Sequence, residues 1–296
     1  MAMKQNRRSA IKSMLAGTAA IGASGTLSSF ALASANISES SLLKGNINHS
    51  VCRWCYADIP LEQLCAASKN MGIKAIDLVG PKEWPVLQQY GLYSAMCNGA
   101  EINLVDGFND KAFHDTLIKN YSEMIPLVAK AGYKNLICFS GNRRGKDDET
   151  GWNNCAEGLK KLMALAEKHQ VILVMELLNS KINHKDNQCD KTSWGVELAK
   201  RVGSENFKLL YDIYHMQIDE GDVIRTIRDN HQYITHYHTG GVPGRNEIDD
   251  TQELYYPAIM QAILATGYKG FVAQEFLPTN PDKMASLKKA IQICDV

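Results

Sequence analysis

Four apolar stretches in the C-terminal half of the chain each end in a side chain that could bind a metal ion or move a proton. These residues are Glu176, Asp212, His238 and Glu275. A short apolar run is typical of a buried parallel strand, whose packing requires no carboxylate or imidazole at its end. Because the four side chains occupy the same relative position, we interpret them as parts of one site. The runs that they close span 171–176, 207–212, 233–238 and 270–275.

Three carboxylates and one imidazole make an oxygen-rich set of ligands. Carboxylates held close together raise one another's pKa unless a cation neutralises them. The set suits Mn²⁺ or Mg²⁺, and Zn²⁺ or Co²⁺ would also fit. Such an ion could bind two oxygens of a hydroxy-carbonyl substrate and polarise its carbonyl. One such residue is usually a loop cap or a surface group, but four in successive strands predict a metal site.

Further polar residues near these runs are candidates for substrate binding. His215 is expected in a loop above the site, where it could hold a substrate hydroxyl or support a metal ligand; the alternative is a solvated histidine. Arg245, in the glycine-rich turn after His238, could clamp a carboxylate or hydroxyls. His236 shares a strand face with His238 one layer lower, so we expect it to line the core or to support a ligand.

Two arginines and three aromatic residues are weaker candidates. Arg143 and Arg144 lie in the loop after the fourth expected strand, where one of them could bind an acid and where solvated side chains are the alternative. Trp54, Tyr56 and Trp84 could wall the pocket, although filling of the core is the more common use of such residues.

Short apolar runs alternate with longer amphipathic runs from residue 47 onward. This alternation predicts a parallel sheet, and eight units favour a closed (β/α)8 TIM barrel over an open doubly wound sheet. A Rossmann-like sheet would need a glycine-rich loop after the first strand, where this chain has Arg53-Trp-Cys-Tyr56. The C-terminal strand ends of a TIM barrel meet on one face, which would bring the four donors together. The earlier strands are expected at 47–54, 73–79, 93–97 and 135–139, and the helices at 61–70, 82–90, 110–131, 154–169, 192–201, 222–230, 253–266 and 282–293.

Composition limits the classes of partner. The 296 residues include 32 basic and 32 acidic side chains, without a long run of either sign. This balance gives no support for a nucleic-acid or anionic-membrane surface. Of the eight cysteines only Cys52 and Cys55 have C-x-x-C spacing, and no second pair completes a zinc site, so we expect buried, unreactive thiols. A small molecule is the expected partner, and the sequence leaves a homo-oligomer open.

The N-terminus has the features of a twin-arginine export signal. Arg7 and Arg8 precede an apolar stretch, and Ala33-Ser-Ala35 supplies the small residues of a cleavage site. Glycine and serine interrupt the stretch, which makes it a poor permanent membrane span. We expect residues 1–35 to be a signal peptide, residues 36–296 to form the barrel domain, and the protein to be periplasmic. A disordered or weakly anchored cytoplasmic N-terminus is the alternative.

Between about residues 47 and 293 the chain resembles the xylose isomerase-like TIM-barrel superfamily, and most closely its hydroxypyruvate isomerase branch. The resemblance rests on segments 174–179, 211–215, 236–245 and 267–275 taken together. It implies that Glu176 and Glu275 face opposite sides of the substrate and move the proton, and that His215 and Arg245 contact the substrate. The residues that it implies as metal ligands are Glu176, Asp212, His238 and Glu275.

Two positions depart from the pattern of this superfamily. Ketose 3-epimerases carry a glutamate six residues after the strand-five ligand, where this chain has Ile182. Family members often have an aspartate shortly after the histidine ligand, where this chain has Gly240 and Gly241, and this replacement predicts a roomier pocket.

The resemblance and the donor set together predict a metal-dependent aldose–ketose-type isomerase, most simply one that converts hydroxypyruvate to tartronate semialdehyde. An alternative enzyme is a ketose or keto-sugar epimerase that uses the same two glutamates at a single carbon. Endonuclease-IV-like phosphodiester cleavage would need more histidine ligands and a basic face, and the neutral charge argues against it. A non-enzymatic alternative is a periplasmic sugar- or metal-binding protein, which would bind its ligand without turnover.

Overall fold

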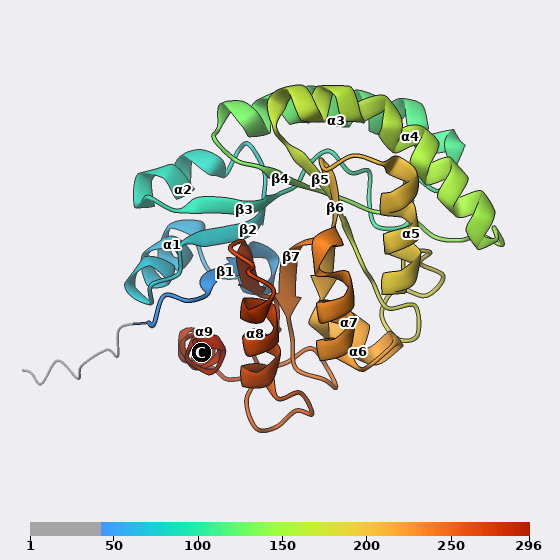
Figure 1. Ribbon diagram of the computed structural model, residues 1–296. Helices are drawn as coiled ribbons and strands as arrows, with labels where there is room; N and C mark the ends of the chain where they lie inside the picture. The colour runs from blue at the N-terminus through green and yellow to red at the C-terminus, as the bar shows by residue number, and fades with distance from the viewer. Residues whose placement is uncertain (1–42) are drawn as a thin grey trace, which may run out of the picture. The chain divides into compact units, whose positions relative to one another are not determined.

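Eight parallel strands form a closed barrel in which each strand pairs with the next and β8 pairs with β1 (Figure 1). This computed structural model describes residues 43–296, so the predicted export signal lies outside the described residues. The predicted (β/α)8 TIM barrel is confirmed. The strands are β1 Asn48–Cys52, β2 Ala75–Val79, β3 Tyr93–Cys97, β4 Asn135–Cys138, β5 Ile172–Glu176, β6 Phe207–Asp212, β7 Ile234–Thr239 and β8 Phe271–Gln274.

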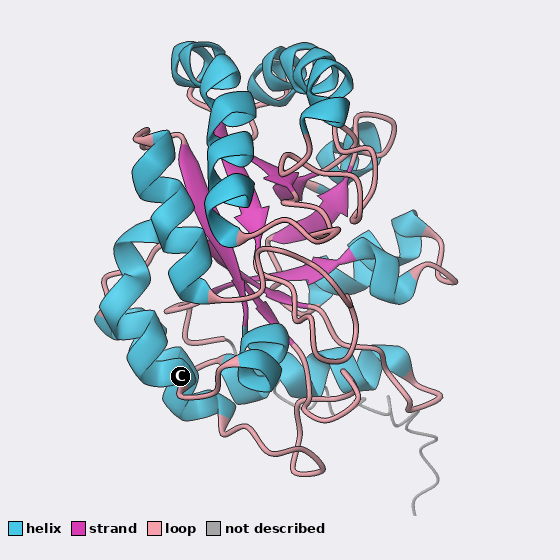
Figure 2. Ribbon diagram, turned by 90° about the vertical axis from the view of Figure 1, so that its right-hand side faces the viewer, coloured by secondary structure: helices cyan, strands magenta, loops and turns pink. Residues whose placement is uncertain are grey.

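Helices surround the barrel and cover the outer face of its strands (Figure 2). In the described part of the chain, no helix combines the length and the apolar character needed to cross a membrane. The helices are α1 Leu61–Asn70, α2 Trp84–Tyr90, α3 His114–Lys130, α4 Asp148–His169, α5 Thr192–Val202, α6 Ile213–Asp219, α7 Val223–Asn230, α8 Tyr256–Ala265 and α9 Lys283–Cys294.

Buried apolar side chains lie on both faces of the strands. The larger cluster joins the outer strand face to the helices and includes Tyr56 and Trp84, which therefore fill the core as expected. A smaller cluster includes Val174 and Leu210. Because alternate residues of a strand share a face, Val174 lies one layer beneath Glu176, and Leu210 one layer beneath Asp212. Apolar packing inside the barrel thus supports two of the predicted metal ligands from below.

Two helices differ from the prediction because aspartates cap them. Helix α4 begins at Asp148 and not at Asn154, since the side chain of Asp147 accepts the Thr150 N–H at 2.8 Å. Helix α6 was not predicted at all. The side chain of Asp212 caps it and accepts the N–H of His215 at 3.1 Å.

Candidate metal centre

The structure brings the four predicted donors together at the carboxyl end of the barrel. Glu176 and Asp212 end β5 and β6, His238 lies near the end of β7, and Glu275 directly follows β8. One ligand atom from each side chain lies within 4.8 Å of the others, and all four side chains are buried. Neighbouring parallel strands position these side chains, and their roles as ligands remain predictions.

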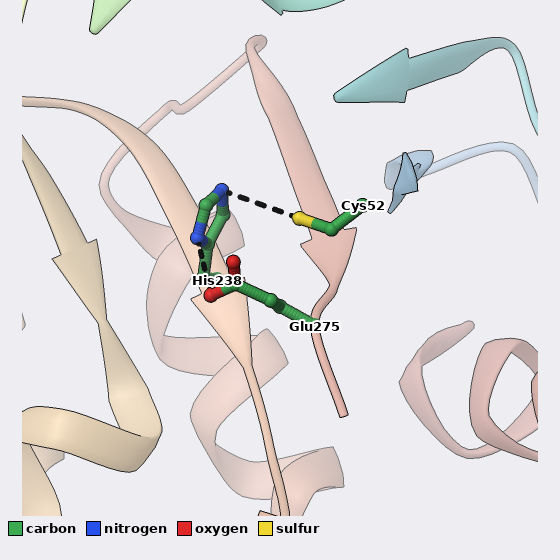
Figure 3. Close-up of side chains that lie close together, drawn as sticks. All are labelled: Cys52, His238 and Glu275. Atoms are coloured by element: carbon green, nitrogen blue, oxygen red, sulfur yellow. Dashed lines mark hydrogen bonds and ion pairs between the residues drawn. The ribbon is translucent and has the colours of Figure 1, made fainter. Parts of the chain in front are cut away.

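The imidazole of His238 separates the carboxylates above it from a second polar group below. Its Nδ1 lies 2.8 Å from Oε2 of Glu275 and 3.4 Å from Oε1 of Glu176. Its Nε2 lies 3.4 Å from Oδ2 of Asp77 and 3.7 Å from Sγ of Cys52. In Figure 3 one ring nitrogen points to Glu275 and the other to Cys52. Burial lowers the pKa of His238, but Cys52, Glu275 and Asp77 together outweigh burial, and the net pKa lies well above its usual value.

Arg245 brings a positive charge to the same carboxylates. Its Nη2 donates to Oδ2 of Asp212 at 3.0 Å and to Oε2 of Glu275. The guanidinium carbon also lies 5.2 Å from the ring centroid of Trp54 and 5.2 Å from that of Tyr214, which is within the range of cation–π attraction. The two aromatic rings and the two carboxylates together hold Arg245 over the site.

The glycines after β7 allow the loop of Arg245 to pack closely. A Cβ at Gly241 would lie 2.2 Å from the carbonyl oxygen of Glu247, so the turn requires glycine there. A Cβ at Gly240 would lie 3.1 Å from Cβ of Tyr214 and 3.3 Å from Cγ of Arg245. The expectation of a roomier pocket at these positions was therefore wrong, because the loop itself fills the space.

Burial and mutual repulsion distribute protons unevenly among the three carboxyl groups. Burial, together with the charges of Glu275 and Glu176, raises the pKa of Asp212 to about 8 although Arg245 opposes the shift. Burial and the charge of Glu275 also raise the pKa of Glu176. Burial raises the pKa of Glu275 as well, but Arg245 and His238 outweigh it and hold that pKa well below the usual range. These shifts favour the protonated form of Asp212 and Glu176 and the ionised form of Glu275.

His215 lies in the first turn of α6 and not in the expected loop, and its burial excludes the alternative of a solvated histidine. The side chain is fully buried, and its Nδ1 lies 2.5 Å from the side-chain nitrogen of Asn179. Burial, helped by the nearby Arg245, lowers the pKa of His215 well below its usual value, so the ring is neutral. Because the Asn179 amide donates to Nδ1, the proton of the neutral ring lies on Nε2. Among residues 43–296 this nitrogen has no hydrogen-bond partner, and it lies 3.6 Å from Oδ2 of Asp212. It can therefore donate to a ligand oxygen.

Two side chains at the site were missed by sequence reasoning or assigned another role. Nε1 of Trp54 donates to Oε1 of Glu275 at 2.6 Å, although we expected this residue to fill the core. Asp77, in β2, is fully buried, and its Oδ2 lies 2.5 Å from Nε2 of His236. An acidic residue inside an apolar strand was the available signal for Asp77. Nothing in the sequence around Trp54 indicated its contact.

Other candidates have structural partners. Nη1 of Arg143 donates to Asp148 at 2.5 Å, and Arg144 pairs with Asp106. His236 lies in the barrel interior and binds Asp77, which agrees with its expected supporting position. All eight cysteines lie in the described part of the chain, where they are free thiols and buried, as expected.

The donor set fits a divalent cation. Nδ1 of His238 points toward the oxygens of Glu176 and Glu275, and the contact of Arg245 with Asp212 and Glu275 shows that this position favours positive charge. Oxygen-rich sets of this kind suit Mn²⁺ or Mg²⁺ and also accept Zn²⁺ or Co²⁺. Two other groups among residues 43–296 share His238 with this set, so we regard them as its surroundings. They are Cys52–His238–Glu275 and Asp77–His236–His238.

Known proteins similar in sequence include named isomerases and epimerases. A human protein named putative hydroxypyruvate isomerase is 30% identical over 122 residues, which make up 41% of this chain and 44% of that protein. The chain therefore matches less than half the length of that relative. The D-psicose 3-epimerase of Ruminiclostridium cellulolyticum is 29% identical over 226 residues, which make up 74% of this chain and 69% of that protein.

Solved structures share the barrel. An AP endonuclease of family 2 from Brucella melitensis aligns with a TM-score of 0.73 and 20% identity, over 81% of this chain and 97% of that one. A structure of the IolI protein with a zinc atom aligns with a TM-score of 0.63 and 13% identity, over 84% of this chain and 95% of that one. At these identities the likeness establishes the fold alone. Residues 84–294 match the family model described as xylose isomerase-like TIM barrel, and the chain belongs to this family.

Proposed function

We propose that the protein is a metal-dependent isomerase of a small hydroxy-carbonyl compound, with hydroxypyruvate as the preferred substrate and tartronate semialdehyde as the product. The carboxyl groups of Glu176 and Glu275 carry this proposal. They lie 3.4 Å and 2.8 Å from the same nitrogen of His238. One ligand atom from each lies within 4.8 Å of the other members of the donor set. Two carboxyl groups beside one binding position can remove a proton from a substrate and return one to it.

The proposed reaction moves two hydrogens within the substrate. Glu275, as the carboxylate, removes a proton from the hydroxymethyl carbon of hydroxypyruvate, and an ene-diolate forms. Glu176, as the acid, gives a proton to the former carbonyl carbon, while the hydroxyl hydrogen passes to the former carbonyl oxygen, so product and substrate contain the same atoms. Proton exchange with water returns both glutamates to their starting states. A bound divalent ion would polarise the carbonyl and stabilise the negative charge of the ene-diolate.

Arg245 and His215 would orient this substrate. The guanidinium of Arg245 is the nearest positive charge for a substrate carboxylate, and an arginine–carboxylate contact fixes both position and direction. The partnerless Nε2–H of His215 would donate to a hydroxyl or carbonyl oxygen. Trp54 is 41% exposed and contacts Glu275, so its ring would form one wall of the binding position.

A keto-sugar epimerase is the second candidate. The D-psicose 3-epimerase relative spans 74% of this chain and therefore favours sugar chemistry as well. Epimerisation would use the same two glutamates, one to remove and one to return a proton at a single carbon. The resemblance implies that ketose 3-epimerases carry a further glutamate where this chain has the exposed Ile182. This difference argues against a ketose 3-epimerase. Phosphodiester cleavage is disfavoured by the net charge of zero.

Proton exchange in D₂O tests the proposal. Purified protein is analysed for bound metal, then incubated with hydroxypyruvate, ketohexoses or 3-keto-glucosides in the presence of Mn²⁺, and again after chelation. We expect Mn²⁺-dependent deuterium incorporation next to the carbonyl of hydroxypyruvate and the appearance of tartronate semialdehyde in NMR spectra. Inversion of a ketose carbon instead would establish the epimerase. Bound metal without exchange on any of these compounds would contradict both enzymes and favour a binding protein.

We also propose that the protein is exported by the twin-arginine route. The proposal rests on the sequence of residues 1–35 alone. We expect mass spectrometry of the periplasmic fraction to show a protein that lacks these residues, and that Arg7→Lys with Arg8→Lys keeps the protein in the cytoplasm. Equal export of the lysine variant would contradict the proposal.

A further inference from the structure

Beneath the candidate metal centre lies a buried carboxylate that the proposed reaction does not use. Asp77 belongs to β2, where it pairs in register with Cys52 of β1. It lies far from His238 in the sequence, and closure of the barrel brings the two together. A buried carboxylate is costly unless charged or hydrogen-bonded partners compensate for its lost hydration. The partners of Asp77 are the two histidines of β7, His236 at 2.5 Å and His238 at 3.4 Å.

The histidine that reaches the metal centre must present a free electron pair on one nitrogen and a proton on the other. Nδ1 of His238 points toward Glu176 and Glu275, so this nitrogen would bind the ion. Nε2 must then carry the proton and needs an acceptor. The acceptors within reach are the carboxylate of Asp77 and the sulfur of Cys52. Sulfur is a weak hydrogen-bond acceptor, and Sγ of Cys52 lies farther from Nε2, at 3.7 Å, than Oδ2 of Asp77 does, at 3.4 Å.

We propose that Asp77 is a positioning residue, which accepts the Nε2 proton of His238 and so keeps Nδ1 free and directed at the metal. The inference rests on the proposed function, in which His238 is a metal ligand. Carboxylates that bind the remote nitrogen of a ligating histidine fix its tautomer and ring orientation and make it more basic. His236 would hold the other side of the same carboxylate oxygen. One charge in β2 would therefore set the orientation of a ligand in β7.

The test measures metal affinity and the protonation of the His238 ring, and it needs no substrate. Mn²⁺ and Zn²⁺ are titrated calorimetrically into the metal-free full chain and into Asp77→Ala and Asp77→Asn. Loss of a partner of this kind typically weakens metal binding about 10- to 100-fold. We expect a loss in this range for Asp77→Ala. A smaller loss is expected for Asp77→Asn, whose amide oxygen can still accept the proton.

Ring nitrogens are observed by long-range ¹H–¹⁵N NMR of the Zn²⁺-loaded protein, with His238→Gln used to assign the signal. Native protein should show a protonated Nε2 and a metal-bound Nδ1 at His238. In Asp77→Ala this pattern should be lost or mixed with the other tautomer. A purely structural role of Asp77 would lower the unfolding temperature but leave the nitrogen pattern unchanged.

Ile137→Ala is the matched control, because Ile137 lies in the inner cluster on β4 and removing its bulk destabilises the barrel without touching the ligands. It should keep native metal affinity. If Asp77→Ala does not fold, Asp77→Asn decides the question by itself. Native affinity together with a native nitrogen pattern in the folded Asp77 variants would overturn the proposal. Because metal alone is the probe, an absence of turnover on any substrate would refute the proposed function and leave this result intact.

Discussion

The two halves of the barrel rim are built from different chemistry. Strands β5 to β8 carry carboxylates and an imidazole at or beside their carboxyl ends, whereas β1, β3 and β4 end in Cys52, Cys97 and Cys138, and β2 ends in Val79. Burial raises the pKa of Cys97 to about 12 and the pKa values of Cys52 and Cys138 well above their usual range. These three thiols are therefore uncharged at neutral pH.

The carboxylates and the imidazole therefore share the rim with strands that end in uncharged thiols and Val79. Electrostatic interactions strengthen where few polar groups and little water screen them. The neutral half thus increases the attraction of the carboxylate half for a cation and for Arg245. Two residues of this half reach across to the charged half, Asp77 in β2 and Trp54 shortly after β1.

The largest effect should come from the two glutamates. Replacing Glu176 or Glu275 with glutamine keeps an oxygen near the metal but removes the proton-transferring group, and we expect proton exchange to slow by about 10² to 10⁴-fold. Deuterium incorporation measured by NMR gives the rate, and metal titration shows whether the ion still binds. Cys138→Ala, at the end of a strand in the thiol half, is the control and should exchange at the native rate. A near-native rate in both glutamine variants would refute the proposed mechanism.

A smaller effect, on metal affinity and KM, is expected from replacing Arg245, and Arg144 on the opposite half of the rim provides the control. Arg245→Met removes a cation that contacts Asp212 and Glu275, so it should tighten Mn²⁺ binding while it raises the KM for a carboxylate-bearing substrate about 10- to 100-fold. Calorimetry and initial rates measure the two quantities. Arg144 pairs with Asp106, and Arg144→Met should alter neither quantity. Unchanged KM and metal affinity in Arg245→Met would remove this arginine from the site.

The smallest effect should appear in the stability of the metal-free protein as a function of pH. The pKa of Asp212 is raised to about 8 in the folded state, against about 3.9 for an unperturbed aspartate. Between these two pH values the folded state therefore keeps a proton on Asp212 that the unfolded state has lost. The stabilisation by this proton is complete below about pH 4 and is lost as the pH rises through about 8. The free energy of unfolding then falls by at most about 1.4 kcal/mol per pH unit.

Urea unfolding of the metal-free protein between pH 5 and pH 8 measures this slope. Asp212→Asn cannot ionise and should reduce this slope, to which the raised pKa values of Glu176 and His238 also contribute, whereas Cys97→Ala in the thiol half should leave it unchanged, because that thiol does not titrate in this range. An Asp212→Asn variant whose slope equals that of the native protein would show that other groups cause the pH dependence.

The alternation of strands and helices and the positions of the donors could be predicted from the sequence because both follow local rules. Strand periodicity and strand ends predicted the barrel and the positions of Glu176, Asp212, His238 and Glu275, which the structure brings into one group. Helix α6 was also locally encoded, since an aspartate three residues before His215 is a capping signal. It was missed because Asp212 had been interpreted only as a ligand.

Only the tertiary structure decided which side chains surround that group. The contacts of Trp54 with Glu275 and of Asp77 with His236 and His238 join residues more than 150 positions apart. No local period relates such residues, because the pairing of β1 with β8 closes the barrel and brings side chains of the first strands to those of β7 and β8. The same closure buries His215 and sets Arg245 against two carboxylates. Sequence alone determined which residues could do chemistry, and closure of the barrel determined their protonation and orientation, because both depend on burial and on neighbours distant in the chain.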